Sequence, residues 1–157
     1  MTHYAACLAN VASLAAGRDP VAITEILAEY GALMIEIIEA EQGFPARRVG
    51  DVITAYWGGL PSQTRQQTAL HACRTALRQL KALAASPRLA ALGLKLNIGI
   101  CSDDPAGCAV LCRACPQADV SILVSRSTRE LCAEAFRFEE LKTPGAPPAF
   151  ILRNADG

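Results

Sequence analysis

Two long segments with helical periodicity, 21–40 and 62–84, are separated by a shorter stretch, 44–57, in which apolar residues alternate. In both long segments apolar side chains recur at steps of three and four residues, which is typical of a helix with one buried face. The alternation around the turn at Gly50-Asp51 is typical of a β-hairpin. A helix with one apolar face must cover another surface, so the pattern predicts a sheet with two long helices packed on it.

Residues with capping chemistry mark the ends of these two helices. Asp19 is a natural N-cap for the first helix, and Pro20 suits its first position. Gly43 is expected to end that helix, because glycine tolerates a positive φ. Ser62 is expected to cap the second helix, and 86–93 is expected to be a connector.

The rest of the chain predicts short elements. The apolar run 4–11 fits either a buried strand or a short helix, and its periodicity leaves both open. The pair Asp103-Asp104, with the Pro and Gly that follow, is expected to break the strand before it. Ser127 is expected to cap a brief helix, and further strands are expected at 94–101, 121–125, 136–141 and 149–152.

The composition is that of one globular domain. Of 157 residues, 52% are hydrophobic and 19% are charged, which excludes global disorder. Lys+Arg and Asp+Glu both count 15, so no basic excess favours nucleic-acid binding, and the zero net charge permits self-association. No apolar run reaches the roughly 20 residues of a membrane helix, and the N-terminal stretch lacks the basic region of a signal peptide. We therefore expect a cytoplasmic protein without membrane contact, whose seven cysteines are free thiols.

The hairpin region carries a family pattern. The run 47–58, RRVGDVITAYWG, is close to K-F-I-G-D-x-x-x-A-x-x-G, and similar stretches follow in order at 69–77, 96–100, 122–125 and 136–141. Together they resemble the catalytic domain of class III adenylate and guanylate cyclases over most of the chain. The resemblance implies an α+β fold with a ferredoxin-like sheet and two long helices packed on it, as a single cyclase-homology domain over 1–157.

The resemblance also implies a reaction and the groups that it needs. In the family, the ribose 3′-oxygen of a nucleoside triphosphate attacks the α-phosphorus and pyrophosphate leaves. Two divalent ions, Mg²⁺ or Mn²⁺, about 4 Å apart, hold the attacking and leaving oxygens. Two carboxylates hold these ions, because hard cations prefer oxygen ligands. Family members work as dimers, with each active site built from both chains.

Three residues are the candidate site residues that the resemblance implies. Asp51 corresponds to the second carboxylate and is the expected metal ligand. The motif of the first carboxylate, F-A-D-I-x-G-F, maps onto 8–14, where Asn10 stands in place of the Asp. The purine-contacting Lys aligns with Arg47, which keeps the charge but changes the donor geometry. Asn10 and Arg47 are therefore nucleotide-binding candidates, with Mg²⁺ or Mn²⁺ as the cofactor if a nucleotide site survives.

Several family features are missing. Between Ile100 and Ser121 nothing matches G-D-x-V-N-x-A-A-R, which supplies a second purine contact and a transition-state Arg; Arg113 is the only Arg there. With one carboxylate also lost, we expect no catalytic residues.

The sequence favours a degenerate cyclase that pairs with itself or with another cyclase-like chain as a regulatory module. A divergent class III cyclase remains the alternative, and Asp51 also suits a hairpin turn without any metal.

Cysteines gather in the segment that lacks the motif. Cys108, Cys112 and Cys115, with Cys101 upstream, have a spacing that could bind Zn²⁺ or an iron–sulfur cluster. The same spacing places the later three on one face of a helix, where buried free thiols are the favoured interpretation. A cysteine-based metal or redox module is therefore the second alternative.

Overall fold

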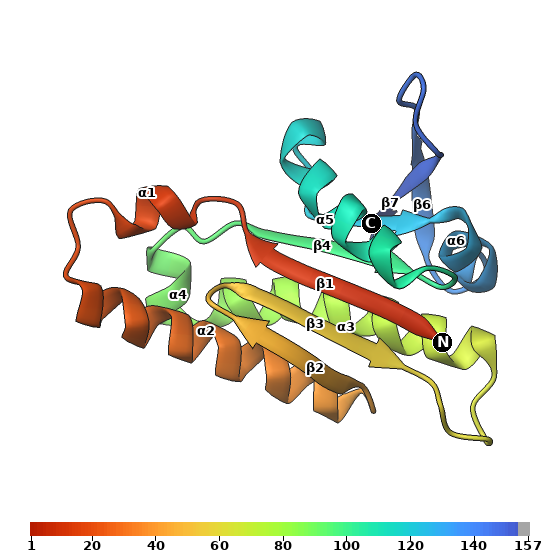
Figure 1. The fold of residues 1–157 in the computed structure, drawn as a ribbon, viewed down its shortest axis with the longest axis horizontal. Coiled ribbons are helices and arrows are strands. Elements are labelled where there is room, and N and C mark those ends of the chain that lie inside the picture. Colours follow the sequence, from red (N-terminus) through yellow and green to blue (C-terminus); the bar gives the residue numbers. More distant parts are fainter. Residues whose placement is uncertain (154–157) are drawn as a thin grey trace.

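The structure is a computed structural model that describes residues 1–153 (Figure 1). One seven-stranded sheet has the order β2-β3-β1-β4-β5-β7-β6. The strands are β1 (Thr2–Leu8), β2 (Phe44–Val49), β3 (Val52–Trp57), β4 (Leu96–Cys101), β5 (Ile122–Ser125), β6 (Arg137–Leu141) and β7 (Ala149–Arg153). The helices are α1 (Val11–Ala15), α2 (Pro20–Ala40), α3 (Arg65–Ala85), α4 (Pro87–Ala91), α5 (Pro105–Ala118) and α6 (Arg126–Cys132).

The first four strands and the two long helices form the ferredoxin-like part of the fold. The chain runs β1-α2-β2-β3-α3-β4 apart from the short helices α1 and α4, and β1 pairs antiparallel with both β3 and β4. Beyond them β5 pairs parallel with β4, and the β6–β7 hairpin closes the far edge. The predicted α+β class, with two long helices packed on a sheet, is confirmed.

Strand β1 resolves the ambiguity of the first apolar run, because it is paired on both sides. Successive side chains of a strand point to opposite faces of the sheet. One face of β1 belongs to the main core under α2 and α3 and carries Tyr4, Ala6 and Leu8. The opposite face, where α5 lies, carries Ala5 and Cys7. This strand therefore contributes to two separate layers.

A buried polar chain links three elements of the main core. The Tyr4 O–H donates to Gln79 Oε1 at 2.6 Å, and Gln79 Nε2 donates to the Met34 carbonyl at 3.1 Å. All three residues are fully buried, so each bond satisfies groups that water cannot reach. The Tyr4 ring also meets Trp57 edge-on, with centroids 5.9 Å apart. These contacts fix β1 against α2 and α3.

The carboxylate of Glu41 joins the end of α2 to α3. It accepts from Arg78 Nη1 at 2.8 Å and from Arg74 Nη1 at 3.4 Å, and it lies 3.1 Å from His71 Nδ1. Burial opposes the charge on Glu41, but the hydrogen bonds from His71 and Arg78 outweigh it and lower the pKa of this carboxyl. The cluster is a structural clamp on the face away from α5.

The end of α2 differs from the expectation. The residue with positive φ is Gln42 (φ 67), whereas Gly43 is outside that region. A Cβ on Gly43 would lie 2.6 Å from Trp57 Cε2, so the glycine is required by close packing against that indole. Gly43 does follow the end of α2 as expected, but it is required by this close packing and not by a positive φ.

Three other boundaries are corrected. Thr64, not Ser62, caps α3, because its side chain and that of Gln67 form a reciprocal capping box. Ser125, not Ser127, caps α6 by accepting from the Thr128 N–H. The connector expected at 86–93 contains α4.

The region that was expected only to break a strand begins a helix. Asp104 accepts from the Ala106 N–H as the N-cap of α5, whose first residue is a proline. Helix α5 lies on the face of the sheet opposite to α2 and α3 (Figure 1). Gly99, paired with Ala5 across the strands, lets it come close, because a Cβ on Gly99 would collide with the backbone of Cys108 and Cys112.

Among residues 1–153, no helix is both long and apolar enough to cross a membrane.

Candidate functional site

Asp51 lies in the turn between β2 and β3, where the hairpin meets the end of β1. Its Oδ2 accepts from the backbone N–H of Leu8 at 2.9 Å. Its own carbonyl accepts from the Tyr30 O–H of α2 at 3.1 Å. Gly50, with φ 61, makes the tight turn that presents this carboxylate. Asp51 is therefore held by the sheet and by a helix, and its side chain is half-buried.

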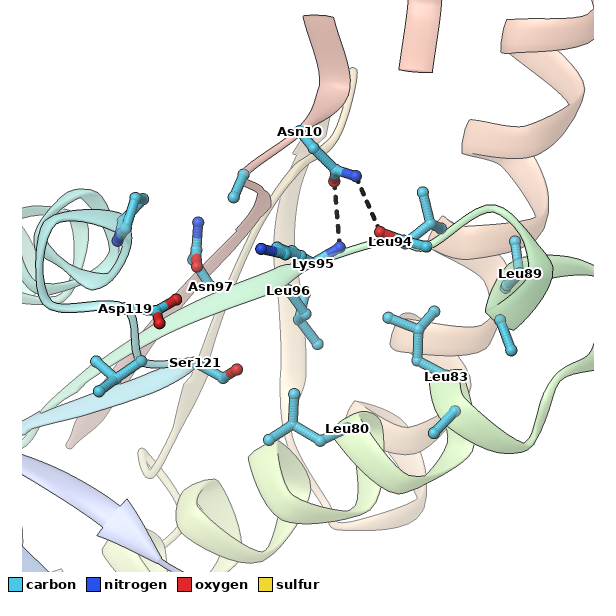
Figure 2. Close-up of a pocket in the computed structure, with 16 residues that line it drawn as sticks. Asn10, Leu80, Leu83, Leu89, Leu94, Lys95, Leu96, Asn97, Asp119 and Ser121 are labelled. Carbon is cyan, nitrogen blue, oxygen red and sulfur yellow. Dashed lines mark hydrogen bonds between the residues drawn. The ribbon is translucent and has the colours of Figure 1, made fainter. Parts of the chain in front are cut away.

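Asn10, the other residue of the expected metal-binding pair, is held elsewhere. Its Nδ2 donates to the Gly93 carbonyl at 2.9 Å, and its Oδ1 accepts from the Lys95 N–H at 3.1 Å (Figure 2). The amide thus joins the segment after β1 to the loop before β4 by two hydrogen bonds. The two side chains are fixed by different backbone segments, and Asn10 serves the loop connection.

A cavity of about 660 Å³ lies beside Asn10 (Figure 2). Apolar side chains of α3, α4 and the start of β4 form much of its lining, and Lys95, Asn97, Asp119 and Ser121 add polar groups. Neither Asp51 nor Arg47 is among its lining residues. The predicted site residues therefore do not converge on this cavity.

Cys7 is the side chain that β1 places near Asp51. Its Sγ lies 3.3 Å from Cys112 Sγ of α5, and Cys112 Sγ also lies 3.3 Å from the carbonyl oxygen of Asn97. The hydrogen bond with Cys112 lowers the pKa of Cys7 to about 7, against the opposing effects of burial and of the negative Asp51. The same hydrogen bond raises the pKa of Cys112. The two thiols thus share one hydrogen bond that joins β1 to α5.

The two arginines of β2 have different environments. Arg48 Nη2 donates to the Leu27 carbonyl at 2.9 Å, and its guanidinium lies over Gly31 of α2. Arg48 thus fastens the hairpin to α2. Arg47 pairs with Thr54 on the opposite face and is exposed, so it is available to an incoming group.

The expected divalent ions do not fit the groups present. Within 1–153 no three His, Cys, Asp or Glu side chains are arranged to hold a metal ion. Asp51 offers one carboxylate, and its near neighbour Cys7 is a soft sulfur ligand that Mg²⁺ and Mn²⁺ do not favour.

The cysteines of α5 lie on its buried face, as their spacing indicated. Burial raises the pKa of Cys108 and that of Cys115 to about 11. Such thiols stay protonated at neutral pH and are poor nucleophiles. Cys7 was missed as their neighbour, although alternation along β1 places it on the face opposite to Tyr4. Local sequence patterns do not predict that α5 covers this face, because the contact depends on tertiary packing.

The comparisons with known proteins agree with this fold. The sequence matches no protein-family model, and it matches no curated protein. The structure is similar to that of the adenylyl cyclase CyaB from P. aeruginosa, with a TM-score of 0.81 and 16% identity over 98% of this chain and 93% of that one.

Two further cyclase domains are also similar. The guanylate cyclase domain of RhGC from Catenaria anguillulae, solved in complex with GTP, has a TM-score of 0.78 and 13% identity over 98% of this chain and 96% of that one. A non-canonical dimeric guanylyl cyclase domain of the RhoGC fusion protein from the aquatic fungus Blastocladiella emersonii has the same score and identity over 98% of this chain and 93% of that one. The chain therefore has the fold of class III nucleotidyl cyclase domains.

Proposed function

We propose that this chain is a cyclase-like domain without catalytic activity that acts as a dimerising, regulatory module. The observation that carries the proposal is the environment of Asp51. Its neighbours are the Leu8 N–H and the Cys7 thiol, and no group of metal-ligating side chains forms around it within 1–153. Two divalent ions held by one carboxylate would bind weakly, and in-line transfer needs both of them.

The environment of Asp51 also supports a new register for the first carboxylate motif. If F-A-D-I is matched to Ala5-Ala6-Cys7-Leu8, a thiol stands where the family has a carboxylate. The bond from Leu8 to Asp51 supports this register, since it brings that part of β1 to the hairpin turn. Asn10 then falls in the loop that follows, which agrees with its bonds to Gly93 and Lys95.

The open face of the β2–β3 hairpin is the proposed dimer surface. Val49 and Val52 are 57% and 44% exposed, and Phe44, also 44% exposed, stacks on Tyr56 with centroids 5.3 Å apart. Apolar side chains gathered on an exposed strand face favour a protein partner. The RhoGC domain named above, which was solved as a non-canonical dimer, lends weight to a second cyclase-like chain as that partner.

Sedimentation tests the dimer. We expect the wild type to sediment as a dimer at micromolar concentration and Val49→Asp to be mainly monomeric, because a buried unpaired carboxylate opposes association. Val110→Asp is the matched control, since Val110 lies on α5 and is also 57% exposed. A wild type that is monomeric throughout, or equal dissociation by both variants, would contradict a dimer through the hairpin.

A divergent cyclase is the second candidate function, favoured by Asp51 at the hairpin turn and by an exposed Arg47 on β2. A partner chain could then complete the site across the dimer.

We propose the reducing cytoplasm as the location, because all seven thiols are free.

A further inference from the structure

The sulfur atoms of Cys7 and Cys112 form a cross-layer pair that neither the fold nor the proposed function requires. Strand β1 supplies one and helix α5 the other, and they lie 3.3 Å apart. Cys7 is half-buried and Cys112 is 4% exposed, so an oxidant in solution reaches Cys7 first.

We propose that Cys7 and Cys112 form a peroxide-reactive dithiol site, in which Cys7 is the attacking thiol and Cys112 the resolving thiol. The proposal is independent of whether the domain dimerises or turns over nucleotides.

The close approach of α5 to the sheet holds the pair in place. Gly99 and Ala5 are paired across β4 and β1, and neither carries a side chain large enough to separate the layers. Asn97, directly across from Cys7 in β4, places its carbonyl oxygen within reach of the Cys112 thiol. The resolving sulfur is therefore held at the attacking one before any reaction begins.

The exposure of the two sulfurs gives the order of events. Cys7 is half-buried, so its sulfur is the one that a dissolved oxidant reaches, and its thiolate is the form that reacts. Cys112 is 4% exposed and lies 3.3 Å behind it, so its sulfur reacts only in the second step, with Cys7.

The chemistry balances with hydrogen peroxide as the oxidant. The Cys7 thiolate attacks one peroxide oxygen; a sulfur–oxygen bond forms, the oxygen–oxygen bond breaks, and hydroxide leaves. The hydroxide released in this first step takes the Cys112 proton and becomes water. The Cys112 thiolate then attacks the sulfur of the Cys7 sulfenic acid; the disulfide forms, the sulfur–oxygen bond breaks, and hydroxide leaves. Two thiols are oxidised and one peroxide is reduced.

A second close pair in the same chain provides an internal control. Cys73 and Cys132 lie 3.9 Å apart in the main core, but they are 0% and 1% exposed. Peroxide reaches neither sulfur without unfolding, so proximity alone should give no reaction there.

The test is a timed reaction of the folded full chain with hydrogen peroxide, followed by thiol counting and peptide mapping by mass spectrometry. We expect the free thiols to fall from seven to five and one disulfide to join Cys7 to Cys112. In Cys112→Ser, the sulfenic acid on Cys7 should persist and be trapped by dimedone. In Cys7→Ser, oxidation should slow at least about tenfold, whereas Cys73→Ser should react as the wild type does.

The order of attack is tested by the same variants. Equal dimedone trapping at Cys7 and at Cys101, or a disulfide that maps mainly to other cysteines, would overturn the proposal. Circular dichroism of each variant ensures that the comparison is between folded proteins.

Discussion

A single methyl group added at Gly99 is expected to lower the unfolding midpoint by about 9 °C, from a loss of about 3 kcal/mol. The new Cβ would meet the carbonyl oxygen of Cys108 and the amide nitrogen of Cys112. These are backbone atoms of a helix and have no rotamer to change, so α5 must move away from β4. Thermal unfolding of Gly99→Ala, followed by circular dichroism, measures the effect.

Gly145→Ala is the control for this substitution. A Cβ there meets no atom within 4 Å, and the cost is limited to the strain of its φ of +77, about 1 kcal/mol. Gly99→Ala should also slow the oxidation of Cys7 with Cys112, since the two sulfurs separate when α5 moves. An unfolding midpoint of Gly99→Ala equal to that of the wild type would show that α5 does not lie against β4.

Replacing Cys7 with aspartate is expected to raise the affinity for Mn²⁺ at least about tenfold, which corresponds to about 1.4 kcal/mol. The change puts a second carboxylate near that of Asp51, and two carboxylates offer a hard cation the charge and the oxygen ligands that one does not. Isothermal titration of Mn²⁺ into the wild type and the variant measures the difference.

Two controls separate charge from position. Cys7→Asn has the shape of aspartate without its charge, and its affinity should stay close to that of the wild type. Asn10→Asp carries the charge but lies at the loop bonded to Gly93 and Lys95, so its affinity should change less than twofold. A larger gain from Asn10→Asp than from Cys7→Asp would restore the original register of the motif.

The elements with strong local signals were predictable from the sequence. The periodic helix 21–40 and the hairpin around Gly50 were found because their patterns are long and their turn chemistry is local. The cap of α3 was expected at Ser62 but lies at Thr64. Thr64 and Gln67 each bond the backbone of the other, and this reciprocal pair stabilises the helix start more than one hydroxyl would.

The candidate site was harder to predict because it depends on packing between distant elements. Asp51 was identified because the run 47–58 resembles the cyclase hairpin motif, but its contact with the Leu8 N–H joins residues 43 positions apart. Cys7 and Cys112 are separated by 105 positions and meet only because Gly99 admits α5. Sequence periodicity does not predict this contact between two distant cysteines. The buried face of α5, in contrast, was predicted from the spacing of its cysteines alone.

Turnover by the purified chain tests the central claim most directly. The protein would be incubated with ATP, GTP, CTP or UTP and Mn²⁺, and cyclic nucleotides would be measured by mass spectrometry beside an Asp51→Ala variant. We expect the wild type to form no more product than the variant or the buffer. A cyclic nucleotide that the wild type makes and Asp51→Ala does not would contradict the loss of catalysis.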